Sequence, residues 1–188
     1  EELGTELGEN WEHGRFNAPY LRDSLLDAGA FAETLETATF WSGIPKLYAA
    51  VRDTLTNVLS ASGTPPLIMC HISHVYPAGA SLYYTVVSAQ GRAIRSEARN
   101  GGAAVAGGSG GSSPQEWLDA VKHWEAAKHA VNDAIIDAGG TITHHHGVGT
   151  DHRDWYAREI GPLGTEILRA VKRQVDPSGI LNPGVLIP

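Results

Sequence analysis

One long amphipathic helix followed by a hairpin constrains the fold of this chain more than any other feature. Between Ser42, the expected N-cap, and Gly63, apolar residues recur every three or four positions and form one stripe. Two strand-like runs follow, 67–76 and 81–89, with a short turn between them. Because the helix stripe and the hairpin must both bury apolar surface, they predict helices packed against an antiparallel sheet.

Patterns in the rest of the chain extend this prediction. A strand with one polar face is predicted over 31–41, and a further short strand between the last two helices. Helical spacing predicts the remaining helices over 19–28, 114–138 and 151–175. The predicted fold class is therefore α+β, an antiparallel sheet covered by helices on one face, with the other face free to cover a ligand.

Breaks in the pattern divide the chain into an arm and one domain. Residues 1–16 show no clear period, so we expect an N-terminal arm, and residues 17–188 then form a single domain. Within that domain, residues 91–113 lose their apolar period and end in a run of Gly and Ser, which predicts a flexible loop. A natural loop and an engineered linker both fit this composition.

Composition argues against several classes of function. A net charge of −7 disfavours nucleic acid as a partner, because phosphate binding relies on clustered Lys and Arg. Cys70 is the only cysteine, so no disulfide framework is available and a reducing compartment is favoured. No apolar stretch reaches the roughly 18 residues needed to span a bilayer, and the acidic start is unlike a signal peptide. We therefore expect a soluble, cytoplasmic protein.

Three consecutive histidines form the strongest candidate site. His144, His145 and His146 precede a Gly-Val-Gly turn and a helix start, where imidazoles could donate or accept and the glycines would let a ligand approach the backbone. A buried cluster, a metal site and a solvated loop are the alternatives. On an extended backbone His145 would point away from its two neighbours, and no carboxylate sits at ligand spacing, so we expect no metal ion.

Five stretches, in this order, carry a resemblance to a known family: Pro19–Asp23 (PYLRD), Glu36–Thr37 before Trp41, Ala80–Tyr83 (ASLY), Gly139–Gly149 (GGTITHHHGVG) and Val175–Pro183 (VDPSGILNP). On these the chain resembles the C-terminal half of flavin-linked oxidases of the vanillyl-alcohol-oxidase type, whose C-terminal domain is a ferredoxin-like cap. The chain has no Gly-x-Gly-x-x-Gly or Walker fingerprint, so no nucleotide-binding fold of its own is expected.

Two positions distinguish subfamilies within this resemblance. Where the 2-hydroxy-acid dehydrogenases of the group have a turn ending in His and a Glu-His-Gly loop, this chain has Tyr83 and His145–Gly147. The phenol and the extra imidazole resemble the alkyl-dihydroxyacetonephosphate synthase subfamily. Members of that subfamily exchange an acyl for an alkyl group on dihydroxyacetone phosphate through a flavin N5 adduct.

The resemblance implies a role for each matching residue. Tyr83 would be the catalytic acid or base, with His145 and His146 catalytic beside it; Arg22 and His144 would bind substrate, the guanidinium holding phosphate or carboxylate oxygens. His146, Gly147 and Asn182 would contact FAD, the implied cofactor. Alternatively, Tyr83 is a packed strand residue, and Arg22 only pairs with a surface carboxylate such as Asp23, Asp27 or Glu36.

The resemblance also implies partners. The family carries an N-terminal domain that holds most of FAD, and we expect this chain to be a fragment or a split subunit that lacks it and binds FAD weakly or not at all. A small-molecule or lipid substrate is implied, and a homodimer is compatible with the sequence. An FAD-dependent oxidase or dehydrogenase of a hydroxy acid or alcohol, and a non-catalytic scaffold domain, are the alternatives.

Overall fold

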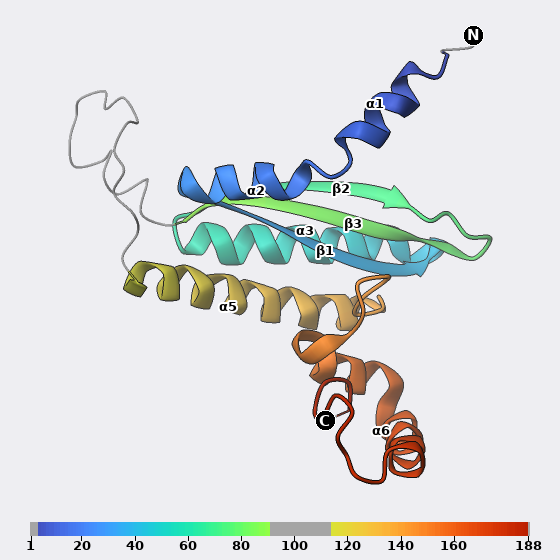
Figure 1. Cartoon of the computed structure of the whole chain (residues 1–188). Helices are drawn as coiled ribbons and strands as arrows, with labels where there is room; N and C mark the ends of the chain where they lie inside the picture. The colour runs from blue at the N-terminus through green and yellow to red at the C-terminus, as the bar shows by residue number, and fades with distance from the viewer. Residues whose placement is uncertain (1–3, 91–113, 188) are drawn as a thin grey trace, which may run out of the picture.

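The computed structural model describes residues 4–90 and 114–187. Its centre is a three-stranded antiparallel sheet of β1 (Ala30–Phe40), β2 (Leu67–Ser73) and β3 (Gly79–Ala89), in the order β1-β3-β2. The strand β3 therefore lies in the middle and pairs with both neighbours along its length. Figure 1 shows the long, twisted sheet with the turn between β2 and β3 projecting at one end. The predicted strand and hairpin are confirmed.

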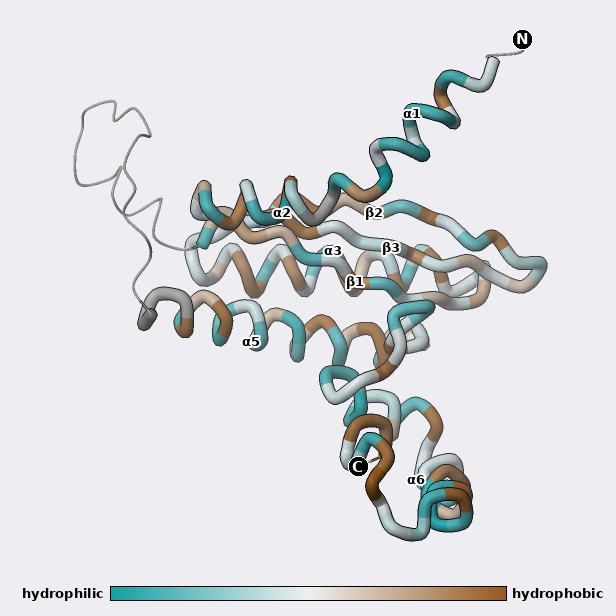
Figure 2. The backbone as a smooth tube through the Cα atoms, viewed as in Figure 1, coloured by the Kyte–Doolittle hydropathy of each residue, from teal (hydrophilic) through white to brown (hydrophobic). Residues whose placement is uncertain are grey.

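Two helices cover one face of the sheet: α3 (Ile44–Ala61), entered through a short 3-10 turn, η1 (Trp41–Gly43), and α5 (Pro114–Ala138). The apolar stripe of α3 is fully buried, as its spacing predicts. Alternate residues of β1 and β3 point toward these helices and complete the core, and the brown segments in Figure 2 mark these apolar positions. The core is formed by Phe31, Leu35, Leu47, Val51, Leu55, Leu59, Leu82, Tyr84, Val86, Ala127, Val131, Ile135 and Ala138.

The remaining helices lie outside this core. The helix α2 (Ala18–Asp27) runs beside β1, α1 (Glu6–Gly14) projects from the sheet, and α6 (Gly149–Val175) leads away from the far end of α5 (Figure 1). A break at Gly161, whose φ is 72°, precedes Pro162 and divides α6 into two segments where the sequence pattern predicts one helix. No helix in the described parts of the chain is long and apolar enough to cross a membrane.

Several local predictions are wrong, for identifiable reasons. Ser42 does not cap α3, because it lies inside the 3-10 turn and Gly43 takes the N-cap position without a side-chain bond. The strand predicted before α6 is instead an irregular loop, residues 139–148, whose positive φ angles are incompatible with a strand. Within the predicted arm, α1 forms a helix that the irregular sequence did not reveal. The predicted flexible loop, 91–113, lies outside the described residues.

Helical spacing places the tryptophans of the last two helices in the core, but two of them are only partly buried. Trp124 packs against Phe31, with 5.4 Å between the ring centroids, and so covers the edge of the core. Trp155 on α6 donates from Nε1 to Asp133 on α5 at 2.9 Å, and this hydrogen bond connects the two helices. The side chain of Trp117 lies outside the described part of the structure.

Candidate functional site

A buried carboxylate lies at the centre of the candidate site. Because side chains alternate along β1, Glu36 points to the sheet face opposite to its neighbours Leu35 and Thr37, which face the helices. In the ladder Glu36 pairs with Tyr83 of β3, which pairs in turn with His71 of β2. Although this face has no helix of the core against it, only 3% of the Glu36 side chain is exposed.

The loop 139–148 covers Glu36 with the three histidines. His144 Nδ1 lies 3.2 Å and His145 Nδ1 3.3 Å from Glu36 Oε1, and His146 Nε2 lies 3.4 Å from Oε2. A carboxylate is acceptor-only, so each imidazole N–H can donate to it. The three imidazoles are therefore gathered around one carboxylate that is more than one hundred positions away in sequence.

Backbone geometry explains this convergence and corrects the sequence expectation. His145 has a φ of 64°, in the left-handed region, so the three side chains do not alternate as they would on an extended strand. The carboxylate that the sequence did not place near the histidines comes from β1. The expectation that the imidazoles diverge, with no carboxylate in reach, is therefore wrong.

Hydrogen bonds to β1 and α6 hold the loop in register. Thr141 donates its N–H to Ala38 O at 3.0 Å, and its own carbonyl accepts from Thr37 Oγ1 at 2.6 Å. At the next residue, Ile142 N–H donates to Glu159 of α6 at 2.8 Å. These bonds fix the loop beside the free edge of β1 only a few residues before the histidines.

Electrostatics favour the charged form of Glu36. Burial by itself raises the pKa of this carboxyl, but hydrogen bonds from His144 and His145 and the nearby charge of His146 outweigh burial. The net result is a Glu36 pKa below its ordinary value. The site therefore contains a fixed negative charge that orients three imidazoles.

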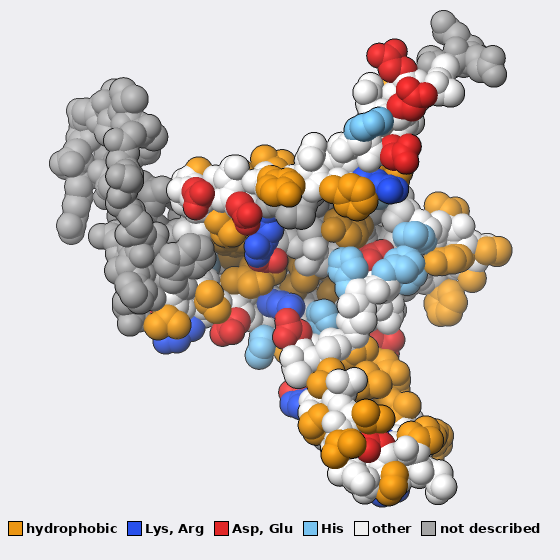
Figure 3. Space-filling view, viewed as in Figure 1, with side chains coloured by type: hydrophobic (Ala, Val, Ile, Leu, Met, Phe, Trp, Pro, Cys, Tyr) orange, Lys and Arg blue, Asp and Glu red, His pale blue; other side chains and the backbone are white. Residues whose placement is uncertain are grey.

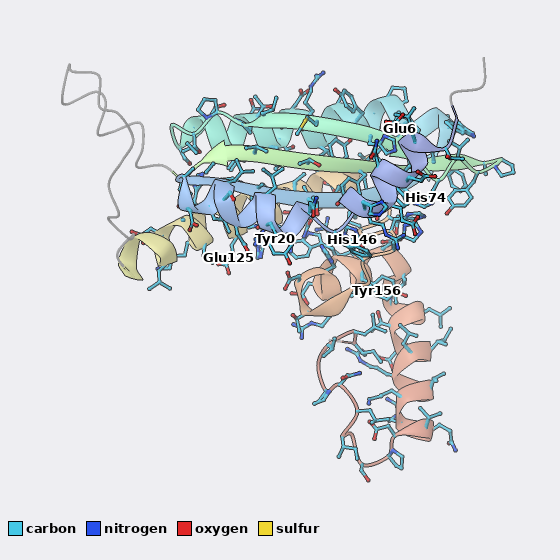
Figure 4. All side chains as sticks on the ribbon, turned by 45° about the horizontal axis from the view of Figure 1, so that its top comes forward. Glu6, Tyr20, His74, Glu125, His146 and Tyr156 are labelled. Atoms are coloured by element: carbon cyan, nitrogen blue, oxygen red, sulfur yellow. The ribbon has the colours of Figure 1, made fainter. Side chains whose placement is uncertain are left out.

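Three further groups from the hairpin join the cluster. The Tyr76 hydroxyl lies 3.3 Å from His144 Nε2, and the ring of His74 lies 4.2 Å from that of His145. Figure 4 shows the labelled side chains of His74 and His146 near the same end of the sheet, although they come from different parts of the chain. Tyr83 joins through its ring, which stands nearly perpendicular to that of His146 at 5.8 Å. Figure 3 shows histidines gathered beside apolar side chains at this end.

The other three predicted residues, Arg22, Gly147 and Asn182, lie in three separate places relative to the cluster. Arg22 forms an ion pair with Glu33 at 2.7 Å, three positions from Glu36 along β1. Gly147 directly follows His146, has a φ of 75°, and has open space beside it. Asn182 lies in the C-terminal tail, which Arg153 holds to α6 by donating to Gly184 O at 2.8 Å. Figure 1 shows this C-terminal tail beside α6 and away from the sheet that carries Glu36.

Two cavities adjoin the cluster. The larger, about 760 Å³, is open to solvent and is bordered by Phe40, Tyr76 and His144. A smaller one of about 140 Å³ is bordered by Glu36, His146 and His152. Burial, together with the nearby charge of Lys128, lowers the pKa of His152 and so favours its neutral form beside the small cavity.

Sequence reasoning missed Glu36, Tyr76 and His74 as members of the site. A signal for Glu36 was present, because a carboxylate stands within the alternating pattern of β1 and belongs to one of the five matching stretches. Alternation identifies the sheet face of a residue but not the loop that covers it. The predicted hairpin brings Tyr76 and His74 near Tyr83. A tyrosine and a histidine near a turn are nevertheless common surface residues, so this proximity alone did not assign them to the site.

Comparisons with known proteins identify relatives of this chain. The family model described as FAD linked oxidases, C-terminal domain, matches residues 3–186. The alkyldihydroxyacetonephosphate synthase of Dictyostelium discoideum is 31% identical over 186 residues, covering 99% of this chain and 26% of that protein. The synthase of Trypanosoma brucei brucei is 28% identical with the same coverages. The chain thus spans about a quarter of the length of these relatives.

A solved structure extends the likeness to the fold. A chain described as alkyldihydroxyacetonephosphate synthase superposes with a TM-score of 0.56 at 22% sequence identity, covering 93% of this chain and 24% of the other. At that identity the likeness concerns the fold alone. The family model, by contrast, matches almost every residue. The chain therefore belongs to the family of C-terminal domains of FAD-linked oxidases.

Proposed function

We propose that this chain forms the substrate-binding and catalytic wall of an FAD-dependent enzyme of the alkyldihydroxyacetonephosphate synthase type. The reaction would exchange the acyl group of an acyl-dihydroxyacetone phosphate for the alkyl group of a fatty alcohol. The ester C–O bond breaks, an ether C–O bond forms, a fatty acid leaves, and there is no net redox change. The observation that supports the proposal most is the meeting of Tyr83 and three imidazoles over the Glu36 carboxylate.

The chemistry of the donor set fits FAD, the cofactor of this family. Imidazole N–H and phenol O–H groups can donate to the carbonyl and ring-nitrogen acceptors of an isoalloxazine edge. The side chains of His145 and His146 are 49% and 42% exposed, so a ring held by another part of the polypeptide could lie against them. Open space at Gly147 would allow close approach to the backbone. Bound FAD would supply the electron-accepting ring.

The residues of this chain would then divide the work of binding and proton transfer. Tyr83 would move a proton at the first carbon of the substrate, and His146, in ring contact with it, would take or return that proton. His145 would act beside them. His144, turned toward the larger cavity, would hold a polar group of the substrate. Arg22 would bind the phosphate only after releasing Glu33, and Asn182 could reach the cofactor only through movement of the tail.

Substitution in the full-length enzyme tests this proposal. Tyr83→Phe and His146→Ala should each lower the rate of acyl-for-alkyl exchange by about 100-fold or more, because each removes a group that transfers protons. His71→Ala is the matched control, since it changes an exposed histidine on the same row of the sheet. Exchange of fatty alcohol into product would be followed by mass spectrometry. Unchanged turnover in both variants would refute the assignment and favour a non-catalytic domain.

The family description also supports a second candidate, an FAD-dependent oxidase or dehydrogenase of a hydroxy acid or alcohol. The two candidates differ in what happens to flavin absorbance. Without oxygen or another electron acceptor, a hydroxy substrate that is oxidised leaves its two electrons on the flavin, which stays reduced and bleached. An exchange reaction leaves no net reduction after turnover. Bleaching by a hydroxy acid without any acyl exchange would therefore favour the second candidate.

A further inference from the structure

Glu36, His144 and His145 have the spacing of a three-ligand metal site. Each offers one ligand atom, and these atoms all lie within 4.8 Å of one another. The two distances from Glu36 Oε1, 3.2 Å to His144 Nδ1 and 3.3 Å to His145 Nδ1, are informative. Metal–ligand bonds of about 2.0–2.1 Å at tetrahedral angles give ligand–ligand distances of about 3.3–3.4 Å. Both Glu36–histidine distances are therefore close to those of a tetrahedral site, and the two imidazoles lie within 4.8 Å of each other at their ligand atoms.

Two of these ligands, His144 and Glu36, each have a neighbouring polar group besides the other ligands, and this second partner supports the orientation that a metal ion would require. His144 Nε2 lies 3.3 Å from the Tyr76 hydroxyl, so the ring can donate there while Nδ1 faces an ion. Glu36 Oε2 lies 3.4 Å from His146 Nε2, which leaves Oε1 as the single ligand oxygen. Metal-binding histidines and carboxylates characteristically have such partners, because these fix the tautomer and the ring orientation.

Burial and donor type indicate the class of ion. Glu36 is buried while about half of the His145 side chain is exposed, so an ion here would keep one coordination position open to solvent. Two imidazole nitrogens and one carboxylate oxygen, without a thiolate, suit Zn²⁺, Co²⁺ and Ni²⁺. Mg²⁺ and Ca²⁺ prefer sets made of oxygen alone.

We propose that Glu36, His144 and His145 bind one divalent transition-metal ion of the Zn²⁺ class. This inference goes beyond the proposed function, since nothing in the exchange of acyl for alkyl groups requires a metal. Metal binding can therefore be tested without any measurement of turnover. Its failure would leave the proposed function standing, and failure of that function would leave the metal site standing.

Titration of the 188-residue chain, stripped with a chelator, provides the first test. Isothermal titration calorimetry with ZnCl₂ should give one ion per chain, and Co²⁺ should give the visible absorption of a four-coordinate site. MgCl₂ and CaCl₂ should give no binding at the same concentrations. Absence of stoichiometric Zn²⁺ binding to the wild-type chain would overturn the proposal.

Variants identify the ligands. His145→Asn removes an imidazole while keeping a residue type that tolerates positive φ, and it should weaken Zn²⁺ binding by about 100-fold or more. Glu36→Gln should do the same. Tyr76→Phe, which removes only a second partner, should weaken binding by about 10-fold.

The matched control is His71→Asn, a histidine of β2 outside the triad, which should leave Zn²⁺ affinity unchanged. Circular dichroism would confirm that each variant remains folded. The proposal is wrong if His145→Asn binds Zn²⁺ like the wild type. It is also wrong if His71→Asn loses as much affinity as the triad variants, because binding would then be spread over the nine histidines of the chain.

Discussion

At the scale of single residues, Glu36 does more than any other group to organise the candidate site. Its side chain is almost wholly buried, yet it belongs to a sheet face that no core helix covers. The energetic cost of burying this charge is offset by three imidazoles and becomes large if they are removed. Histidine orientation and Glu36 burial therefore depend on each other, and a change in either should disturb both.

Glu36→Gln should make the unfolding free energy less dependent on pH in the acidic range. Because the pKa of Glu36 lies below its ordinary value of 4.5, the charged carboxylate stabilises the fold above that value. This contribution is lost as the pH falls through the folded-state pKa. Urea unfolding should show Glu36→Gln less stable by about 1–3 kcal/mol at pH 7, with the gap closing in acid. A gap that stays constant from pH 7 to pH 3 would contradict this account.

The sequence identifies site residues that stand in short motifs, but not residues that become part of the site only through contact with a distant segment. The histidines and Tyr83 stand in short motifs, so they could be identified without any knowledge of the fold. Glu36 is recognisable only as a polar residue in a strand, because the loop that covers it comes from the other end of the chain. The convergence of the imidazoles depends on the left-handed backbone of His145, a conformation that a histidine seldom adopts.

At the scale of elements, periodic segments were predicted well and irregular ones poorly. The helices α3 and α5 and the hairpin bury regular apolar positions, so their spacing revealed them. Residues 139–148 instead take their shape from individual hydrogen bonds to β1 and α6, which no local pattern encodes. The break of α6 at Gly161 was also missed. Helical spacing continues on both sides of the Gly-Pro pair, so we predicted one helix although this pair is typical of a turn.

The close approach of β1 and β3 at Gly79 allows a prediction at this scale. An added Cβ would lie 2.1 Å from Thr39 O and 2.9 Å from Phe40 Cα, so Gly79→Ala must push the strands apart. We expect a loss of about 1–3 kcal/mol in unfolding free energy. The turn that carries His74 and Tyr76 should shift with the strand end, which would appear as changed NMR signals of the histidine rings.

Gly8→Ala is the control for this substitution. Gly8 lies in the exposed helix α1, with ordinary φ and no atom within 4 Å of an added Cβ. Its replacement should leave the unfolding free energy of the domain unchanged, because α1 contributes no residue to the core. If both variants lost the same unfolding free energy, the loss would come from replacing any glycine and not from the close contact between β1 and β3.

At the scale of the whole molecule, burial is distributed unevenly. Every buried member of the core cluster comes from β1, β3, α3 or α5, whereas α6 buries only Thr165 within the described chain. Several large apolar side chains on the second segment of α6 are more than half exposed, Leu163, Ile167, Val171 and Val175 among them. Contacts of α6 with the rest of the domain rest mainly on polar pairs, such as Arg158 with Asp133 and Asp137.

This uneven burial predicts two levels of protection from hydrogen exchange. Local opening costs little where few apolar contacts are broken, so amides of α1 and of α6 after Gly161 should exchange well before those of β3 and α3. Hydrogen-exchange mass spectrometry on the chain would resolve these segments as separate peptides. The first turns of α6, joined to the histidine loop through Glu159, should fall between the two levels. If α6 exchanged as slowly as β3 along its full length, the domain would open as one cooperative unit, and the histidine loop would then be as rigid as the sheet that it covers.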